Sequence, residues 1–276
     1  MASNAAPRIR LLALDMDGTL FRQNLVISAG VQDAIRRAQT AGVKVALATG
    51  RMPAAARSFV ELLGLSGPQL YANGALVQTV EGEVIFHLPV DPPVARQVVE
   101  YARARSFHVN VYVGDSVYVD RLTPEAEFTR MLNRLDPVPV GDLASFVADH
   151  APTKMVIVRL PAVEAGLLDQ LRQDFQGRLL VFSSVPQYIE MVNPQVDKGR
   201  TLGKLAAILE LSTAEIAAVG DGDNDFTLLQ AAGLPIAMGN GTDRLKSIAR
   251  YVVGTVEQDG VAEAIDRYVL PTNFGS

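Results

Sequence analysis

The sequence contains no cysteine, no tryptophan and only three histidines, His87, His108 and His150. Without cysteine there is no disulfide framework, no thiolate nucleophile and no cysteine-ligated zinc or iron–sulfur site. No two histidines are close in sequence, which argues against a multi-histidine metal site or a histidine-based triad. What remains is the chemistry of carboxylates and hydroxyls, with a hard cation such as Mg²⁺.

The chain also lacks an excess of positive charge and a long apolar run. Its 276 residues carry 25 Lys and Arg against 30 Asp and Glu, a net charge of −5, whereas nucleic-acid-binding domains are usually basic. No apolar run approaches the roughly 18 residues of a membrane span. Residues 1–10 contain no apolar signal core. We therefore expect a cytoplasmic protein that binds neither nucleic acid nor membrane.

Apolar strands alternate with amphipathic helices at both ends of the chain. Buried strands are predicted at 9–14, 43–48, 69–72, 216–219, 235–238 and 251–253, with helices starting near Ser28, Pro53, Lys198, Asn224, Asp243 and Gly260. This alternation predicts an α/β fold with a doubly wound, Rossmann-like parallel sheet.

The middle of the chain has a different, α+β pattern. Two hairpins are predicted, at 75–88 and 109–119, and residues 137–139 are expected to form a loop. The predicted core therefore comprises residues 1–82 and 187–276, and residues 83–186 are an insertion large enough to form a domain of its own.

Polar residues follow the predicted core strands. Ligands of open α/β sheets bind beyond the carboxyl ends of the strands. The residues at these ends are Asp15, Asp17, Thr19, Thr49, Gly50, Arg51, Asn73, Asp221, Asp223, Asn224 and Asp225, and Lys198 begins the helix before the fourth strand.

Three of these carboxylates predict a metal site. Asp15 and Asp17 are two residues apart on an extended segment, so both side chains can face one side. Together with Asp221 they would repel strongly unless a cation lay between them. Mg²⁺ prefers oxygen ligands and commonly brings a phosphate with it.

Other groups of the predicted site can hold phosphate oxygens. They are Thr49, Lys198 and the backbone N–H groups of Met16 and Gly50. Carboxylates also serve as covalent phosphoryl acceptors. The pattern indicates phosphoryl transfer.

Four motifs occur in the order of the haloacid dehalogenase superfamily motifs, namely Asp15–Leu20, Ala48–Arg51, Asp197–Gly199 and Gly220–Asp225. The sequence resembles the Cof-type subfamily (IIB) of sugar-phosphate phosphatases, whose α+β cap is inserted between the second and third motifs. The insertion at 83–186 falls at this place.

This resemblance implies a role for each site residue. Asp15 would be the nucleophile that becomes an aspartyl-phosphate, and Asp17 the general acid and base. Mg²⁺ would be held by Asp15, the backbone carbonyl of Asp17 and Asp221. The expected phosphate-binding residues are Met16, Thr49, Gly50, Arg51, Asn73, Lys198 and Asn224, with Asp225 orienting the site from behind.

Some roles stay open between function and structure. Arg51 and Asn73 either reach the substrate or brace the loops, and Glu190 either contacts substrate or has a structural role. Asp223 is better explained as a loop or cap residue, and Gly239–Gly241 as a turn. None of the histidines is expected to be catalytic.

We predict a Mg²⁺-dependent phosphatase for a small phosphorylated metabolite such as a sugar phosphate, acting as a monomer or small homo-oligomer. The alternative enzyme is a phosphohexomutase of the phosphomannomutase kind, which would yield an isomerised sugar phosphate instead of free phosphate. A receiver-type signalling protein also places acids, Thr and Lys on a parallel sheet. It would be shorter and would show a long-lived phosphorylated form without turnover.

Overall fold

The computed structural model describes residues 8–21 and 25–270, so most of the segment on which the signal-peptide prediction rests lies outside the described residues. The chain divides into two compact units. Unit 1 comprises residues 1–51, 57–85 and 197–276, and unit 2 comprises 52–56 and 86–196. Within the described ranges, no helix has the length and apolarity that crossing a membrane requires.

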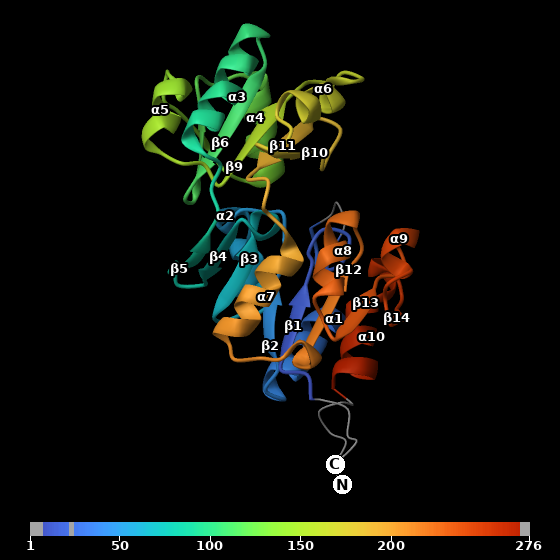
Figure 1. The fold of residues 1–276 in the computed structure, drawn as a ribbon. Helices are drawn as coiled ribbons and strands as arrows, with labels where there is room; N and C mark the ends of the chain where they lie inside the picture. Colours follow the sequence, from blue (N-terminus) through green and yellow to red (C-terminus); the bar gives the residue numbers. More distant parts are fainter. Residues whose placement is uncertain (1–7, 22–24, 271–276) are drawn as a thin grey trace. The chain divides into compact units, whose positions relative to one another are not determined.

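Unit 1 is built on a parallel five-stranded sheet (Figure 1), which confirms the predicted α/β class. Its strands are β1 (Leu11–Leu14), β2 (Lys44–Leu47), β12 (Ile216–Gly220), β13 (Leu234–Ala237) and β14 (Tyr251–Val252), in the order β14-β13-β12-β1-β2. The side chains of β1 and β12 are all buried, as expected for a sheet covered on both faces.

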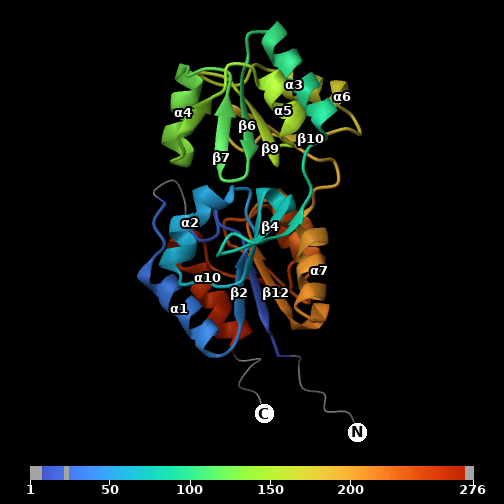
Figure 2. The same ribbon diagram turned by 90° about the vertical axis from the view of Figure 1, so that its left-hand side faces the viewer.

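Helices cover both faces of this sheet. They are α1 (Ala29–Thr40), α2 (Pro53–Leu62), α7 (Lys198–Ile208), α8 (Phe226–Gln230), α9 (Asp243–Lys246) and α10 (Gly260–Ala264). Figure 2 shows α1 and α10 on one side of the sheet and α7 on the other. The predicted cap of α1 is confirmed, since the Ser28 hydroxyl accepts from the Val31 N–H at 3.1 Å.

The third predicted strand belongs to a small antiparallel sheet of β3 (Pro68–Tyr71), β4 (Leu76–Thr79) and β5 (Val84–His87). Beside β2 it makes only an isolated parallel bridge between Ala48 and Leu70. The prediction of one continuous parallel sheet was therefore wrong at this position. The ladder bonds of β3 go to β4, the strand that follows it along the chain, in an antiparallel register.

Unit 2 contains a six-stranded sheet in the order β10-β11-β9-β6-β7-β8. The strands are β6 (His108–Val113), β7 (Ser116–Val119), β8 (Pro137–Pro139), β9 (Lys154–Val158), β10 (Leu180–Phe182) and β11 (Tyr188–Val192), with helices α3 (Pro92–Ala104), α4 (Pro124–Asn133), α5 (Leu143–Asp149) and α6 (Leu167–Asp174). Figure 2 shows α4 on one side of this sheet and α3 and α5 on the other. Val98, Val111, Ile157 and Ile189 are among its fully buried core residues.

The structure differs from the predicted insertion in three places. Residues 137–139 are the edge strand β8, paired with β7, and not a loop; proline is tolerated at a sheet edge. The second boundary lies near residue 197 instead of 187, because β11 pairs with β9 and β10. The first boundary lies near residue 86 instead of 83. The reason is that β5 pairs in the small sheet of unit 1, and unit 1 extends to Ile85.

Candidate active site

Asp15 stands directly after β1, with its N–H bonded to Val219 O at 3.0 Å. Its side chain is only 6% exposed. The turn that follows requires glycine at position 18, where φ is +88° and a Cβ would lie 2.2 Å from Asp221 Oδ2. This glycine lets the loop after β1 approach Asp221, which follows β12.

Lys198 forms hydrogen bonds to Asp15, which follows β1, and to Asp225, which lies beyond the end of β12. Its Nζ donates to Asp15 Oδ1 at 2.8 Å and to Asp225 Oδ1 at 2.6 Å, and the side chain is almost completely buried. Lys198 opens α7, whose cap is Asp197, with Oδ1 2.6 Å from the Arg200 N–H. Burial alone would lower the pKa of Lys198, but the two carboxylates raise it, so the side chain is an ammonium group.

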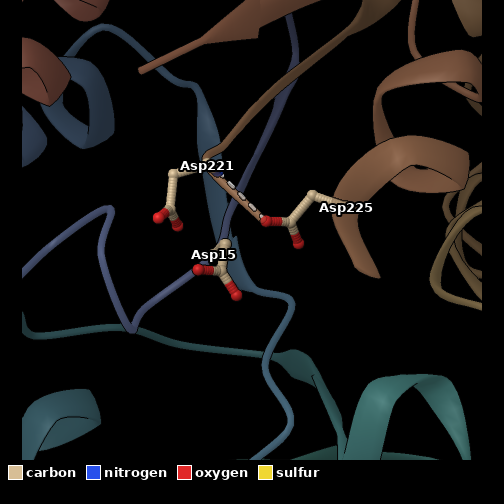
Figure 3. A group of neighbouring side chains, drawn as sticks. All are labelled: Asp15, Asp221 and Asp225. Atoms are coloured by element: carbon tan, nitrogen blue, oxygen red, sulfur yellow. Dashed lines mark hydrogen bonds between the residues drawn. The ribbon is translucent and has the colours of Figure 1, made fainter. Parts of the chain in front are cut away.

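Asp225 is fully buried, and both its oxygens accept hydrogen bonds. Figure 3 shows the bond from Asp221. Oδ1 accepts from Lys198, and Oδ2 accepts from the N–H groups of Asp221 and Gly222 at 3.1 and 3.0 Å. These bonds fix the loop that carries Asp221. They agree with the predicted orienting role of Asp225, which stays a prediction.

Asp15, Asp221 and Asp225 form an acidic cluster in which one carboxylate oxygen of each lies within 4.8 Å of the others. Figure 3 shows the side chains of Asp15 and Asp221 directed into a common space. Burial, followed by the charge of Asp225, raises the pKa of Asp15 well above its usual value and that of Asp221 to about 6. Three carboxylates thus face a single ammonium group, and this donor set suits a hard divalent cation.

Asp225 accepts three hydrogen bonds, whereas Asp221 accepts two, from Thr19 and Asn240, and Asp15 is bonded to Lys198 through one oxygen. Asp15 and Asp221 therefore retain more capacity as carboxylate ligands. The carboxylate of Asp17 is not part of this cluster. The expectation that the Asp17 carboxylate shares a cation with Asp15 and Asp221 was therefore wrong, because this carboxylate is bonded to Arg51. The role of the Asp17 backbone carbonyl as a metal ligand stays a prediction.

Asp221 is held by two residues to which the sequence assigned no role, although Thr19 had been placed among the polar residues at the strand ends. Thr19 Oγ1 donates to Asp221 Oδ1 at 3.1 Å, and Asn240 Nδ2 donates to Asp221 Oδ2 at 3.3 Å and to Gly18 O at 2.8 Å. Asn240 Oδ1 in turn accepts from the Val256 N–H at 2.9 Å. The signal in the sequence was the run Gly239–Gly241, which we interpreted as a turn alone.

Thr49, Asn73 and Asn224 lie together, as predicted for residues at neighbouring strand ends. Thr49 O accepts from the Asn73 N–H at 2.9 Å, and Asn224 Nδ2 donates to Asn73 Oδ1 at 3.3 Å. Asn73 adopts a left-handed backbone with φ of 57°. A Cβ on Gly50 would lie 3.2 Å from the Asn73 amide, so Gly50 permits a close approach of the loop.

Arg51 and Asp17 form an ion pair with two hydrogen bonds, Nε to Oδ2 at 2.8 Å and Nη2 to Oδ1 at 2.7 Å. Arg51 had been predicted to bind phosphate or to brace the loops. In the structure the guanidinium group is paired with the predicted general acid and base. The predicted role of Arg51 toward phosphate stays a prediction.

Glu190 belongs to unit 2, where it forms a buried ion pair with Lys154 at 2.8 Å. His108 is also in unit 2, between Asn110 Oδ1 and Thr123 Oγ1 at 3.0 Å each, and its burial lowers its pKa. Both residues have partners within unit 2, which agrees with a structural role.

Comparison with known proteins identifies the family. Residues 12–265 match the family of haloacid dehalogenase-like hydrolases. The phosphatase YwpJ of Bacillus subtilis is 29% identical over 92% of this chain and 98% of its own length. The 5-amino-6-(5-phospho-D-ribitylamino)uracil phosphatase YcsE of the same species is 30% identical, covering 95% of this chain and 96% of its own.

A solved structure of a haloacid dehalogenase-like hydrolase from Bacteroides thetaiotaomicron is also similar. It has a TM-score of 0.85 and 29% sequence identity, and the match covers 94% of this chain and 99% of the other. The likeness therefore extends over both units.

The chain belongs to the haloacid dehalogenase-like hydrolase family, as its four motifs indicated, and it is an enzyme of the phosphatase class. The predicted family, fold class and enzyme class are thereby confirmed.

Proposed function

We propose that this enzyme hydrolyses a small phosphoric monoester, such as a sugar phosphate, with Mg²⁺ at the acidic cluster and Asp15 as the nucleophile. The observation that carries the proposal is the environment of Asp15. It is a buried carboxylate at a strand end, bonded through one oxygen to Lys198 and grouped with Asp221.

In the first step a carboxylate oxygen of Asp15 forms a bond to phosphorus while the bond from phosphorus to the ester oxygen breaks. Asp17 gives its proton to the departing alkoxide, which leaves as the alcohol. In the second step Asp17 takes a proton from water, which attacks phosphorus and releases phosphate, so that Asp15 is restored.

The metal, when bound, supplies positive charge that offsets the charges of nucleophile and phosphate. Asp15, Asp221 and the backbone carbonyl of Asp17 would hold it. Lys198 holds Asp15 in place and, with Thr49 and Asn224, would bind the phosphoryl oxygens. Met16 and Gly50 would contribute backbone N–H groups, and Asn73 would support Asn224 through the bond between their amides.

Unit 2 is proposed to be the cap that selects the leaving group, since in sequence it occupies the place of the cap in Cof-type phosphatases. The similarity to YcsE, whose name gives a phosphorylated ribityl compound as substrate, supports a polyol or sugar phosphate ester as the substrate class. We propose a small cytoplasmic metabolite as the partner, in keeping with the net charge of −5, since nucleic-acid-binding domains are usually basic.

A panel of phosphorylated sugars, polyols, nucleotides and cofactors tests the proposed substrate class, with ranking by kcat/KM in Mg²⁺. We expect the highest values among sugar and polyol phosphates and loss of activity with EDTA. A higher kcat/KM for nucleotides would contradict the substrate class, and full activity without divalent cations would contradict the proposed metal.

The products separate hydrolysis from the alternatives. Free phosphate with multiple turnovers supports the phosphatase, and we expect this result. Conversion of a hexose 1-phosphate to its isomer in the presence of the bisphosphate would identify a mutase. A stable phosphorylated protein without turnover would identify a receiver-type protein.

A further inference from the structure

The two side chains of the ion pair between Arg51 and Asp17 differ in how much of each is exposed to solvent. The Asp17 side chain is 55% exposed, whereas that of Arg51 is 18% exposed. The exposed carboxylate is therefore held by a largely buried cation. Arg51 is the fixed partner of the pair.

Two hydrogen bonds fix the backbone of Arg51, and two aromatic rings lie near its guanidinium group. Its N–H donates to Thr49 Oγ1 at 3.1 Å, and its carbonyl oxygen accepts from the Ala72 N–H at 2.9 Å. The guanidinium carbon lies 5.3 Å from the ring centre of Phe21 and 5.8 Å from that of Phe59. The two rings stack with their centres 4.6 Å apart, and a cation near aromatic faces gains from their quadrupoles.

Within residues 8–21 and 25–270, the hydrogen bonds to the Asp17 side chain come from Arg51. Asp17 precedes Gly18 and is half-exposed, and both its oxygens accept from the one guanidinium group. A planar guanidinium orients a carboxylate in two directions at once, unlike an ammonium group. The orientation of Asp17 is thus set by Arg51.

We propose that Arg51 is a positioning residue for Asp17, and that it affects proton transfer to the leaving group through Asp17 instead of binding the phosphoryl group. This inference rests on the proposed function, in which Asp17 exchanges the proton. Misplacing a catalytic group by about 1 Å can cost about 100-fold in rate.

The dependence on the leaving group distinguishes this role from phosphate binding. For a phosphatase that works through a covalent intermediate, kcat/KM reports the steps up to release of the alcohol. p-Nitrophenol leaves as a stable anion, whereas glycerol from glycerol phosphate needs a proton. A defect in the positioning of Asp17 therefore lowers kcat/KM for the alkyl ester selectively.

The first test is Arg51→Met, which keeps an apolar side chain against Phe21 and Phe59. We expect kcat/KM for glycerol phosphate to fall about 10- to 100-fold and that for p-nitrophenyl phosphate by less than about threefold. The matched control is Arg36→Met, at an exposed arginine of α1 paired with Asp33, for which both values should stay unchanged. Equal losses for the two esters in Arg51→Met would overturn the proposal.

The second test repeats Arg51→Met in an Asp17→Asn background, where it should cause no further loss for either ester. The same loss in this background would also overturn the proposal. If Arg51→Met does not fold, Arg51→Lys replaces it in both tests. We then expect a smaller loss of kcat/KM, again selective for glycerol phosphate. A different result, Asp17→Asn with an undiminished rate on glycerol phosphate, would instead refute the proposed role of Asp17 and with it the proposed function.

Discussion

At the scale of single residues, the geometry of the site depends on neighbouring side chains that fix the positions of the carboxylates through hydrogen bonds. Asp221 illustrates this most clearly, because both of its oxygens accept a hydrogen bond, from Thr19 and from Asn240. Each carboxylate oxygen retains a further lone pair for a metal ion.

Asn240→Asp should weaken Mg²⁺ binding. The new carboxylate would face Asp221 without the amide donor, and loss of partners around metal ligands typically costs about 10- to 100-fold in affinity. Isothermal titration of the metal-free protein measures the effect directly. Asn193→Asp is a matched control because Asn193 lies in unit 2, where its amide donates to Pro89 O. An unchanged Mg²⁺ affinity in Asn240→Asp would contradict the role of Asn240.

The raised pKa of Asp221 predicts how stability depends on pH. Burial raises this pKa from about 3.8 to about 6, so the folded state binds the proton more tightly than the unfolded chain. The contribution of Asp221 to the free energy of unfolding therefore falls as pH rises from about 4 to about 6, by roughly 1–3 kcal/mol at about 1.4 kcal/mol per unit. This loss persists above pH 6 in the absence of metal.

Urea unfolding of the metal-free protein at pH 5 and pH 7.5, compared with Asp221→Asn, isolates this contribution. We expect Asp221→Asn to gain stability relative to the wild type as pH rises between these values. Mg²⁺ should stabilise the wild type more at pH 7.5 than at pH 5. A pH dependence identical in the two proteins would refute the prediction.

At the scale of elements, the sequence was sufficient where local signals decide the structure. The buried runs of β1 and β12 and the Ser28 cap of α1 were located from periodicity and capping residues. The proximity of Asp15 and Asp221 follows from their places directly after the neighbouring parallel strands β1 and β12. The sequence did not predict that Asp225 would replace the Asp17 carboxylate in this cluster.

Pairing partners could not be predicted in the same way. The sequence of β11 predicts a buried strand. Its place in the sheet of unit 2 depends on contacts with β9, which lies about thirty residues earlier. Asp17 and Arg51 are 34 residues apart, and their bond depends on side-chain directions. The role of Asn240 depends likewise on the approach of Gly18, which is distant in sequence.

The cap of α7 gives a prediction at this scale. Asp197→Ala removes the acceptor of the Arg200 N–H and should lower the free energy of unfolding by about 1 kcal/mol. Because Lys198 is the first residue of the same helix, kcat/KM should also fall.

Ser28→Ala is the control, since it removes the cap of α1, which carries no site residue. It should cost similar stability and leave kcat/KM unchanged. Equal activity of the two variants would show that the start of α7 does not position Lys198.

At the scale of the whole molecule, the chemistry-bearing residues all belong to unit 1, while unit 2 has a hydrophobic core of its own. We expect residues 86–196 expressed alone to fold, because this core is formed within the segment. Circular dichroism during urea titration should show one cooperative transition. A gradual, non-cooperative change would indicate that unit 2 requires unit 1 for folding.

The central claim is that Asp15 carries the phosphoryl group between substrate and water. Asp17→Asn should let p-nitrophenyl phosphate react, because this leaving group needs no proton, and should slow hydrolysis of the intermediate. Rapid acid quench of this variant in Mg²⁺, followed by peptide mass spectrometry, should find the phosphoryl group on Asp15. The double variant Asp15→Asn, Asp17→Asn should carry no phosphoryl group. Turnover without any phosphorylated Asp15, or a phosphoryl group on another residue, would contradict the account.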